Sequence, residues 1–351
     1  MIITKTPYRV SFFGGGTDYP NWFKENGGAV LGTSISHYCY IHGRIFPPFF
    51  NYKYRIVWSK IEEVFELDDI EHPVIREALK WKDLKVGMEI HHNGDLPARS
   101  GLGSSSSFTV GLLHMLYALN GELPSKEKLT QEAIFLEQSL LGETVGIQDQ
   151  ILASHGGLNK VKIEESGEYI LDPIVLTKQR ASDFEDRILL FYTGVSRFAS
   201  NIAKKQVSAI PKKISELHEM QKMVGIASDI LLNGNDLDDF GRLLHQSWKL
   251  KRSLEPSIAP GFVNDIYAKA IRAGALGGKL LGAGGGGFMI FYVTPELRQS
   301  VLNALSDLLL VPFSIDYNGT ELMYSQSHLY SKISMDRSVY FQRKNLGESS
   351  N

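Results

Sequence analysis

Two glycines and four consecutive serines stand where a loop meets a helical pattern, a combination that can bind phosphate. In the stretch LPARSGLGSSSSF, residues 96–108, Gly101 and Gly103 precede Ser104 to Ser107. The first N–H groups of a helix lack partners and carry partial positive charge, and glycine lets the backbone approach a ligand closely. The serine hydroxyls can add hydrogen bonds or coordinate Mg²⁺. A single serine there would indicate a helix cap, but four serines after G-L-G favour a phosphate site.

Two acidic residues form the second group that could do chemistry. Glu137 and Asp149 stand twelve residues apart in the stretch LEQSLLGETVGIQDQ. Phosphoryl transfer needs a cradle for the phosphates, a metal ion and an oriented acceptor hydroxyl. One carboxylate on the metal and one beside the hydroxyl complete such a set. On composition alone, two acids at this spacing are more often solvated surface groups.

Other sites with familiar sequence signatures are excluded. The serine run has no preceding lysine, so it is not a Walker A loop. Gly282, Gly284 and Gly287 spell G-x-G-x-x-G, but the apolar run FMIFYV after them predicts a strand, whereas a dinucleotide site requires a helix. His91 and His92 are neighbours on a predicted strand and therefore point to opposite faces, which disfavours a metal hydrolase. H-E-x-x-H and G-x-S-x-G are both absent.

The surrounding patterns predict the elements that must position these groups. Alternating and β-branched residues over 2–13 predict a strand that ends in a glycine run. Apolar residues at every second position over 86–90 predict a half-buried strand directly before the serine loop. Apolar residues at helical spacing predict a helix over 104–119, and a second over 125–141. A buried strand begins at Arg187, which places a domain boundary just before it.

Length and composition describe an ordinary globular protein. The chain of 351 residues predicts about two domains, which we divide as 1–185 and 186–351. The net charge of -2 gives no global attraction to nucleic acid or to an anionic membrane. The single cysteine, Cys39, suits a reducing compartment. With no signal-peptide pattern and no apolar run long enough to span a bilayer, a cytoplasmic location is expected.

Three glycine-rich stretches together resemble the motifs of the GHMP kinases. PYRVSFFGGGTDYP, LPARSGLGSSSSF and LLGAGGGGFM stand in the order and spacing of the three family motifs. The E…GIQDQ segment is similar to the galactokinase segment that carries the metal glutamate and the catalytic aspartate. The resemblance covers about residues 5–290 and implies a two-domain α+β fold with the active site in the cleft between the domains. It also implies an N-domain with a left-handed βαβ crossover and a ferredoxin-like C-domain.

The resemblance also implies the role of each motif residue. Asp149 would orient or deprotonate the acceptor hydroxyl, with Arg9 beside it and the transferred phosphate. Ser105 and Glu137 would hold Mg²⁺. The residues implied to bind ATP are Pro97, Arg99, Ser100, Gly101, Leu102, Gly103, Ser104, Ser105 and Ser106. The residues implied to bind or support the substrate are Asp18, Gly15, Gly16, Thr17, Gly284 and Gly285.

The substrate is suggested by what the first motif lacks. Galactokinases carry a Glu-His pair just before Thr-Asp-Tyr, and this chain has Gly15 and Gly16 there. FFGGGTDYP and LLHQSWKLKRSLEPSIAP resemble the D-glycero-D-manno-heptose 7-phosphate kinases, which phosphorylate the anomeric hydroxyl to give the 1,7-bisphosphate on the route to nucleotide-activated heptose. The resemblance thus implies ATP and a small sugar phosphate as partners, and it leaves room for a homodimer.

A basic helix face is a candidate for the substrate's existing phosphate. His245, Lys249 and Arg252 fall at i, i+4 and i+7, so they share a face that could hold a doubly charged sugar phosphate. Arg197 is a further candidate. A solvated stripe explains the same pattern equally well. Two functional alternatives stay open: a kinase of another sugar, galactose- or fucose-like, and a catalytically idle relative that senses a sugar phosphate or nucleotide.

Overall fold

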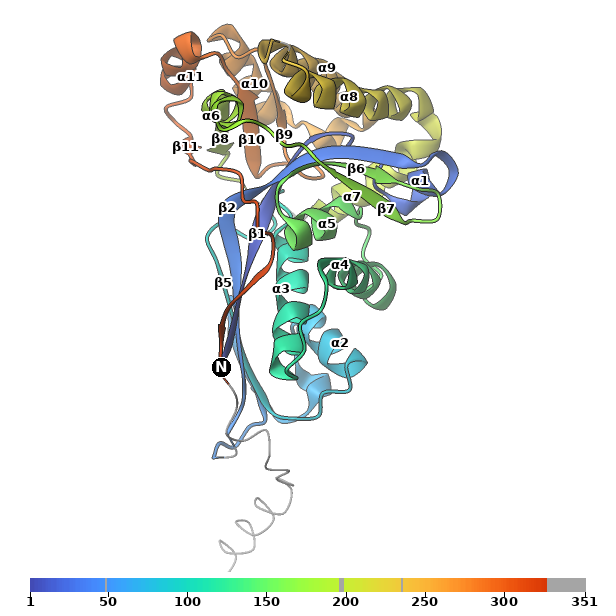
Figure 1. Cartoon of the computed structure of the whole chain (residues 1–351), viewed down its shortest axis with the longest axis vertical. Coiled ribbons are helices and arrows are strands. Elements are labelled where there is room, and N and C mark those ends of the chain that lie inside the picture. The colour runs from blue at the N-terminus through green and yellow to red at the C-terminus, as the bar shows by residue number, and fades with distance from the viewer. Residues whose placement is uncertain (48, 196–198, 235, 327–351) are drawn as a thin grey trace, which may run out of the picture.

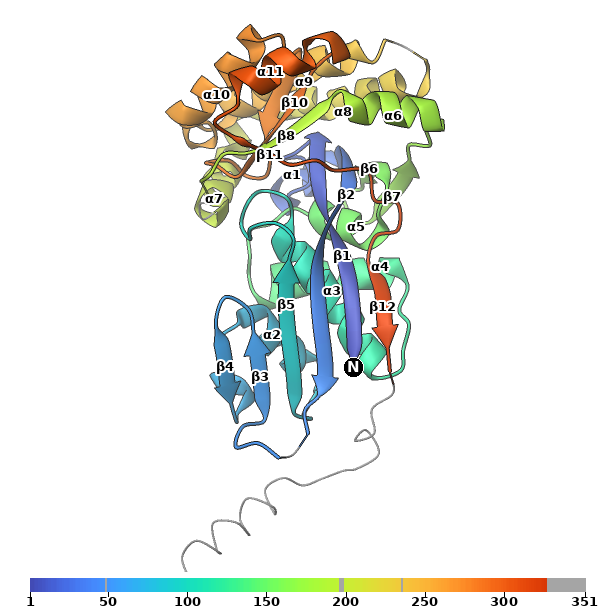
Figure 2. The same ribbon diagram turned by 90° about the vertical axis from the view of Figure 1, so that its left-hand side faces the viewer.

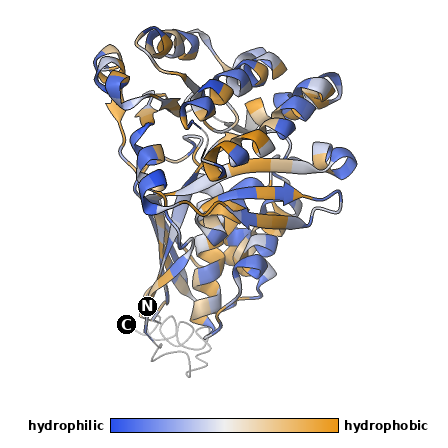
Figure 3. Ribbon diagram, turned by 45° about the horizontal axis from the view of Figure 1, so that its top comes forward, coloured by the Kyte–Doolittle hydropathy of each residue, from blue (hydrophilic) through white to orange (hydrophobic). Residues whose placement is uncertain are grey.

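The computed structural model describes residues 1–47, 49–195, 199–234 and 236–326, and it contains two β-sheets with helices packed on them (Figure 1). Arg197 lies outside the described residues. Within the described ranges, no helix has both the length and the apolar character needed to cross a membrane. In Figure 3 many helices carry both hydrophilic and hydrophobic residues, as expected for helices that pack one face on a core.

The first sheet is built on two long strands, β1 (Ile2–Phe13) and β2 (Gly28–Ile45). Its order is β12-β1-β2-β5-β3-β4, which Figure 2 shows face on. β2 also pairs with β6, and β6 with β7. The other bounds are β3 Tyr54–Val57, β4 Ile61–Val64, β5 Met88–Gly94, β6 Leu158–Ile163, β7 Tyr169–Pro173 and β12 Glu321–Ser325.

Helices cover one face of this sheet (Figure 1). The central one is α3 (Ser104–Leu119), which is buried from Ser106 to Ala118 and contacts both β1 and β2. It begins and ends where the sequence predicts, as does β1. The others are α1 Pro20–Asn26, α2 Pro73–Trp81, α4 Lys126–Phe135 and α5 Gln148–His155. The helix predicted over 125–141 differs: α4 passes into one π-helical turn at Leu136–Leu140.

The second sheet is antiparallel and has the order β11-β8-β10-β9. If these four strands are numbered 1 to 4 along the chain, their order in the sheet is 4-1-3-2, as in a ferredoxin-like sheet. Their bounds are β8 Ile188–Tyr192, β9 Gly277–Leu280, β10 Phe288–Tyr292 and β11 Leu309–Leu310. The accompanying helices are α6 Lys178–Asp186, α7 Ala199–Ala209, α8 Ile214–Leu232, α9 Asp238–Leu254, α10 Gly261–Arg272 and α11 Arg298–Ala304.

The C-terminal part of the described chain returns to the first sheet. β12 pairs antiparallel with β1, with Ile2 opposite Ser325. The predicted segment 186–351 is therefore not one separate spatial unit, because its residues 321–325 belong to the sheet of the N-terminal half. A linear pattern could not reveal this, since any strand can pair with any free edge.

Aromatic packing joins the two halves. Phe12 of β1 makes edge-to-face contacts with Phe184 of α6 and Phe240 of α9, with ring centroids 5.7 and 5.4 Å apart. All three side chains are buried. Edge-to-face pairs add about 0.5–1.5 kcal/mol each to the stabilisation from apolar burial. The end of β1, which leads into the first glycine run, is thus fixed against the second half of the molecule.

Candidate active site

The serine-glycine loop has the local geometry of an anion site. Gly101 and Gly103 have φ angles of 87° and 72°, in the left-handed region that favours glycine. Gly103 is the residue before α3, and no side chain caps the helix there. The first N–H groups of α3 are therefore left for a ligand. Ser104, Ser105 and Ser106 all line the adjoining cavity.

The third glycine run supports this loop from the second sheet. A Cβ on Gly282 would lie 2.6 Å from Cα of Gly101, and one on Gly287 would lie 2.1 Å from the carbonyl oxygen of Ser100. Phe288 N–H, where β10 begins, donates to that same oxygen at 3.2 Å. The run is followed by a strand, which confirms that it is not a dinucleotide fingerprint. Because its glycines have no Cβ, the backbone of this run packs directly on the backbone of the serine-glycine loop.

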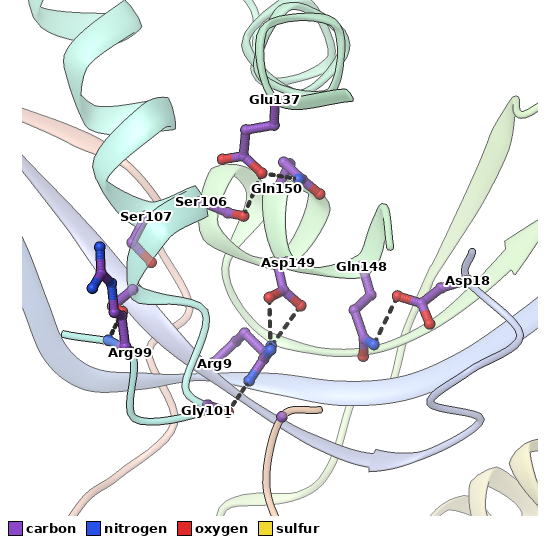
Figure 4. A network of polar contacts seen from close by, with 12 residues as sticks. Arg9, Asp18, Arg99, Gly101, Ser106, Ser107, Glu137, Gln148, Asp149 and Gln150 are labelled. Atoms are coloured by element: carbon purple, nitrogen blue, oxygen red, sulfur yellow. Dashed lines mark hydrogen bonds and ion pairs between the residues drawn. The ribbon is translucent and has the colours of Figure 1, made fainter. Parts of the chain in front are cut away.

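Arg9 and Asp149 form an ion pair that is joined by two hydrogen bonds, beside the serine-glycine loop (Figure 4). Nε and Nη2 of Arg9 donate to the two carboxylate oxygens at 2.7 and 2.6 Å, and Nη1 donates to the carbonyl of Gly101 at 2.5 Å. Arg9 lies on β1 and Asp149 in the first turn of α5. One arginine thus ties the carboxylate to the serine-glycine loop, because a guanidinium fork matches a carboxylate in geometry.

Glu137 lies behind the start of α3 and is fully buried. Its Oε2 accepts from Ser106 Oγ at 2.9 Å and from Gln150 Nε2 at 2.5 Å (Figure 4). Its Oε1 is buried with no hydrogen-bond partner in the described structure. Burial raises the pKa of Glu137 from 4.5 to about 7. The residue belongs to the π-helical turn, and such turns often mark functional sites.

Within the serine run, Ser106 is the residue that contacts Glu137, and the expected role of Ser105 beside Glu137 at Mg²⁺ stays a prediction. Ser106 is buried and donates to the carboxylate, whereas Ser105 is exposed and lines the cavity. Successive residues of a helix point about 100° apart, so only one of the two hydroxyls can face Glu137. The run of four serines alone could not reveal which one.

Asp18 is held on the opposite side of the cavity. Its carboxylate accepts from the N–H of Gly16 at 3.1 Å and from Gln148 Nε2 at 2.8 Å. Burial raises the pKa of Asp18, and the neighbouring charge of Asp149 raises it further. Oε1 of Gln148 is buried without a partner in the described structure. This oxygen remains available to a hydroxyl group of a ligand.

These groups meet around one cavity of about 460 Å³. Both halves of the chain line it, and Lys204, Gln206, Lys251 and Gly282 come from the second half. Of the residues expected at the site, eleven line it: Arg9, Gly15, Gly16, Asp18, Arg99, Gly101, Gly103, Ser104, Ser105, Ser106 and Asp149. Glu137 lies behind Ser106.

Other expected residues lie away from the cavity wall. Thr17 is buried and donates to the carbonyls of Gly14 and Ala29, so its role is to fix the turn. Pro97 is exposed, Leu102 is buried in the core, and Ser100 is buried beneath the third glycine run. Gly284 and Gly285 pack against Ile258 instead of facing the cavity.

The predicted basic face of α9 is turned away from the cavity. Lys249 is exposed, and Arg252 donates to Asn264 Oδ1 at 2.9 Å. The lysine that lines the cavity is Lys251, which is 4% exposed. It falls in line with the buried Leu244 and Trp248 at helical spacing. A lysine within this apolar stripe was the signal that sequence reasoning overlooked.

Comparison with known proteins agrees with this geometry. The family models for the GHMP kinases N terminal domain and the GHMP kinases C terminal match residues 70–157 and 223–309. D-glycero-alpha-D-manno-heptose 7-phosphate kinase of Campylobacter jejuni is 28% identical over 87% of this chain and 93% of its own length. Galactokinase of Pyrococcus furiosus is 26% identical over 89% of this chain and 95% of its own.

A solved structure gives the same fold. The crystal structure of a D-glycero-D-manno-heptose 1-phosphate kinase from Bacteriodes thetaiotaomicron superposes with a TM-score of 0.76. It is 23% identical, and the match covers 93% of this chain and 100% of the other. With both matches in order on one chain, this protein has the N- and C-terminal domains of the GHMP kinases and is a phosphotransferase that acts on a sugar.

Proposed function

We propose that this protein transfers the γ-phosphoryl group of ATP to the anomeric hydroxyl of D-glycero-D-manno-heptose 7-phosphate. The product would be the 1,7-bisphosphate, an intermediate toward nucleotide-activated heptose. The observation that carries the proposal is the Arg9–Asp149 pair, anchored on the carbonyl of Gly101 in the phosphate loop. It supports the proposal because Asp149, the proposed acceptor-activating carboxylate, lines the same cavity as the loop proposed to bind the phosphates.

Each group has a defined part in this reaction. The N–H groups at the start of α3 bind phosphate oxygens, and Asp149 accepts or orients the hydroxyl proton. Arg9 keeps that carboxylate in place and adds positive charge near the transferred group. The protein therefore contributes mainly positioning and electrostatic stabilisation, which is what phosphoryl transfer requires.

A magnesium ion fits the pair formed by Glu137 and Ser106. Oε1 of Glu137 is buried and without a partner in the described structure, and oxygen ligands are those that Mg²⁺ prefers. Among the described residues no group of three or more His, Cys, Asp and Glu side chains could hold a metal. Phosphate oxygens of ATP would complete the coordination. The ion would neutralise charge on the phosphates.

The sugar is proposed to lie between the first glycine run and Asp18. Gly15 and Gly16 line the cavity without side chains. A Cβ on Gly16 would lie 3.1 Å from Gln206 Nε2, so no larger residue fits there without moving its neighbour. Asp18 and Gln148 supply oxygens for sugar hydroxyls. The relationship to the heptose 7-phosphate kinase of Campylobacter jejuni supports this substrate class.

A substrate panel tests the proposal. ADP formation would be measured with Mg²⁺ and ATP against heptose 7-phosphate, heptose, galactose, fucose and hexose 6-phosphates, and the phosphorylated position by phosphorus NMR. We expect kcat/KM for heptose 7-phosphate to exceed that for galactose by about 100-fold or more. The galactokinase relative makes a galactose-like sugar the second candidate. Turnover of galactose alone would establish that alternative, and tight binding without turnover would indicate a sensor.

A further inference from the structure

Lys251 is a buried lysine that faces the reacting groups. It lies on α9 and is 4% exposed, yet it is one of the residues that line the cavity. Its Nζ donates to the carbonyl of Gly282 at 2.6 Å. Gly282 in turn packs backbone to backbone on Gly101 of the phosphate loop. The ammonium group is therefore held from the second half of the chain beside the place where nucleotide phosphates would lie.

The charge of Lys251 has no carboxylate partner in the described part of the chain. An ammonium group has three N–H donors, and one is engaged with Gly282. Arg9 differs in that its charge is already paired with Asp149, although two of its five N–H groups remain after the bonds to Asp149 and Gly101. Lys279, a second buried lysine nearby, donates to the carbonyl of Phe12 and does not line the cavity. Lys251 thus keeps two donors for an anionic ligand.

We propose that Lys251 is a catalytic residue whose ammonium group binds an oxygen of the phosphoryl group as it passes from ATP to the acceptor. The bond from the γ-phosphorus to the bridging oxygen of ATP breaks, and a bond to the acceptor oxygen forms. The hydroxyl proton passes to Asp149 and then to water. Lys251 is unchanged at the end. The proposal depends on the phosphotransferase activity, and not on which sugar is the substrate.

The energetic setting of Lys251 agrees with this role. Burial lowers the pKa of Lys251 to about 8 and the positive charge of Arg9 lowers it too, while the carboxylates of Asp18 and Asp149 partly offset this. A buried cation that has no counter-charge in direct contact is costly, and an arriving anion reduces that cost. An interaction that strengthens as negative charge spreads over the phosphoryl oxygens accelerates the chemical step, whereas uniform binding would not.

The test separates charge from packing. Lys251→Met keeps the length and apolar stem of the side chain and removes the ammonium group. We expect kcat to fall about 100- to 1,000-fold, the usual effect of removing one transition-state donor, with KM for ATP and sugar within about 3-fold. Lys269→Met, an exposed lysine of α10 outside the cavity, is the matched control.

A second variant shows whether the positive charge is what matters. Lys251→Cys, treated with 2-bromoethylamine, regains a lysine-like ammonium group. The native Cys39 is buried, and burial raises its thiol pKa, so it should not react. Recovery of at least about tenfold in kcat over untreated Lys251→Cys is expected, with treated wild type as the control.

The outcomes distinguish this inference from the proposed substrate. The assay uses whichever sugar the wild-type protein turns over best, so a different sugar leaves the test of Lys251 intact. Near-wild-type kcat in Lys251→Met would overturn the inference. A raised KM for the sugar at unchanged kcat would also overturn it, because Lys251 would then bind the acceptor in its ground state. If Lys251→Met does not fold, the alkylated Lys251→Cys variant decides. Recovery of kcat supports the inference, and no recovery overturns it.

Discussion

The burial of Glu137 predicts that the ligand-free protein loses stability as pH rises. In the folded chain burial raises the pKa of this carboxyl from 4.5 to about 7. Between these values the native state keeps a proton that the unfolded state has lost. The stability contributed by the neutral carboxyl is therefore fully present below pH 4.5, and it is lost as pH rises through about 7.

The size of the effect follows from the shift in pKa. Each pKa unit corresponds to about 1.36 kcal/mol, so the shift at Glu137 amounts to about 3 kcal/mol in the free energy of unfolding. The group is fully buried, so solvent screening does not reduce this figure. The effect is a sizeable part of the 5–15 kcal/mol that is typical of folded proteins, about a fifth to three fifths of it.

Glu137→Gln removes the titration and leaves the shape. Unfolding by urea would be measured for both proteins at several values from pH 5 to pH 8, without Mg²⁺ or nucleotide. We expect the stability of the wild type to fall relative to the variant by about 2.5 kcal/mol over this range, because part of the loss occurs below pH 5. Glu122→Gln, at an exposed position, is the control, and its stability should change with pH as that of the wild type does. If the free energy of unfolding changes with pH in the same way for the wild type and for Glu137→Gln, the reasoning about Glu137 is wrong.

Three further predictions concern the phosphate loop and its neighbours. Asp149→Asn should lower kcat about 10²- to 10⁴-fold with an unchanged circular dichroism spectrum, and near-normal turnover would remove Asp149 from the mechanism. Ser106→Ala should raise the Mg²⁺ concentration that gives half the maximal rate about tenfold, and Ser105→Ala should raise it less. A larger effect of Ser105→Ala would make Ser105 the Mg²⁺ ligand. Gly103→Ala should lower stability by about 1–2 kcal/mol in urea, because φ is 72°, and should also lower kcat, because the new Cβ would lie 3.0 Å from Arg9 Cγ.

Local patterns predicted the parts of the fold that depend on neighbouring residues. β1 and α3 lie where alternation and helical spacing placed them, because both depend on which side of a single element is buried. The turn between Ser100 and Ser104 was also predicted, because glycines directly before a helical pattern favour a tight turn, and its use as a phosphate site stays a prediction. The strand that follows the glycine run 282–287 was predicted from its apolar residues.

Features that depend on distant residues could not be predicted in this way. The contact between Ser106 and Glu137 depends on a π-helical turn, which shifts the facing residues and has no sequence signature here. Lys251 was missed in favour of Lys249 and Arg252 because spacing shows which residues share a face, but not which face meets the cavity. Burial of a charged residue is visible only once the opposing elements are in place.

The return of β12 to the first sheet has a mechanical consequence. Two stretches of chain now connect the sheets, residues 174–187 and residues 311–320. The second stretch is itself fastened to β2, where Ser36 N–H donates to Ser314 and Asp316 N–H donates to Ser34. The second half of the chain is therefore tethered to the first sheet by two stretches instead of one. The second tether limits how far the two halves can move apart without breaking the hydrogen bonds to β2.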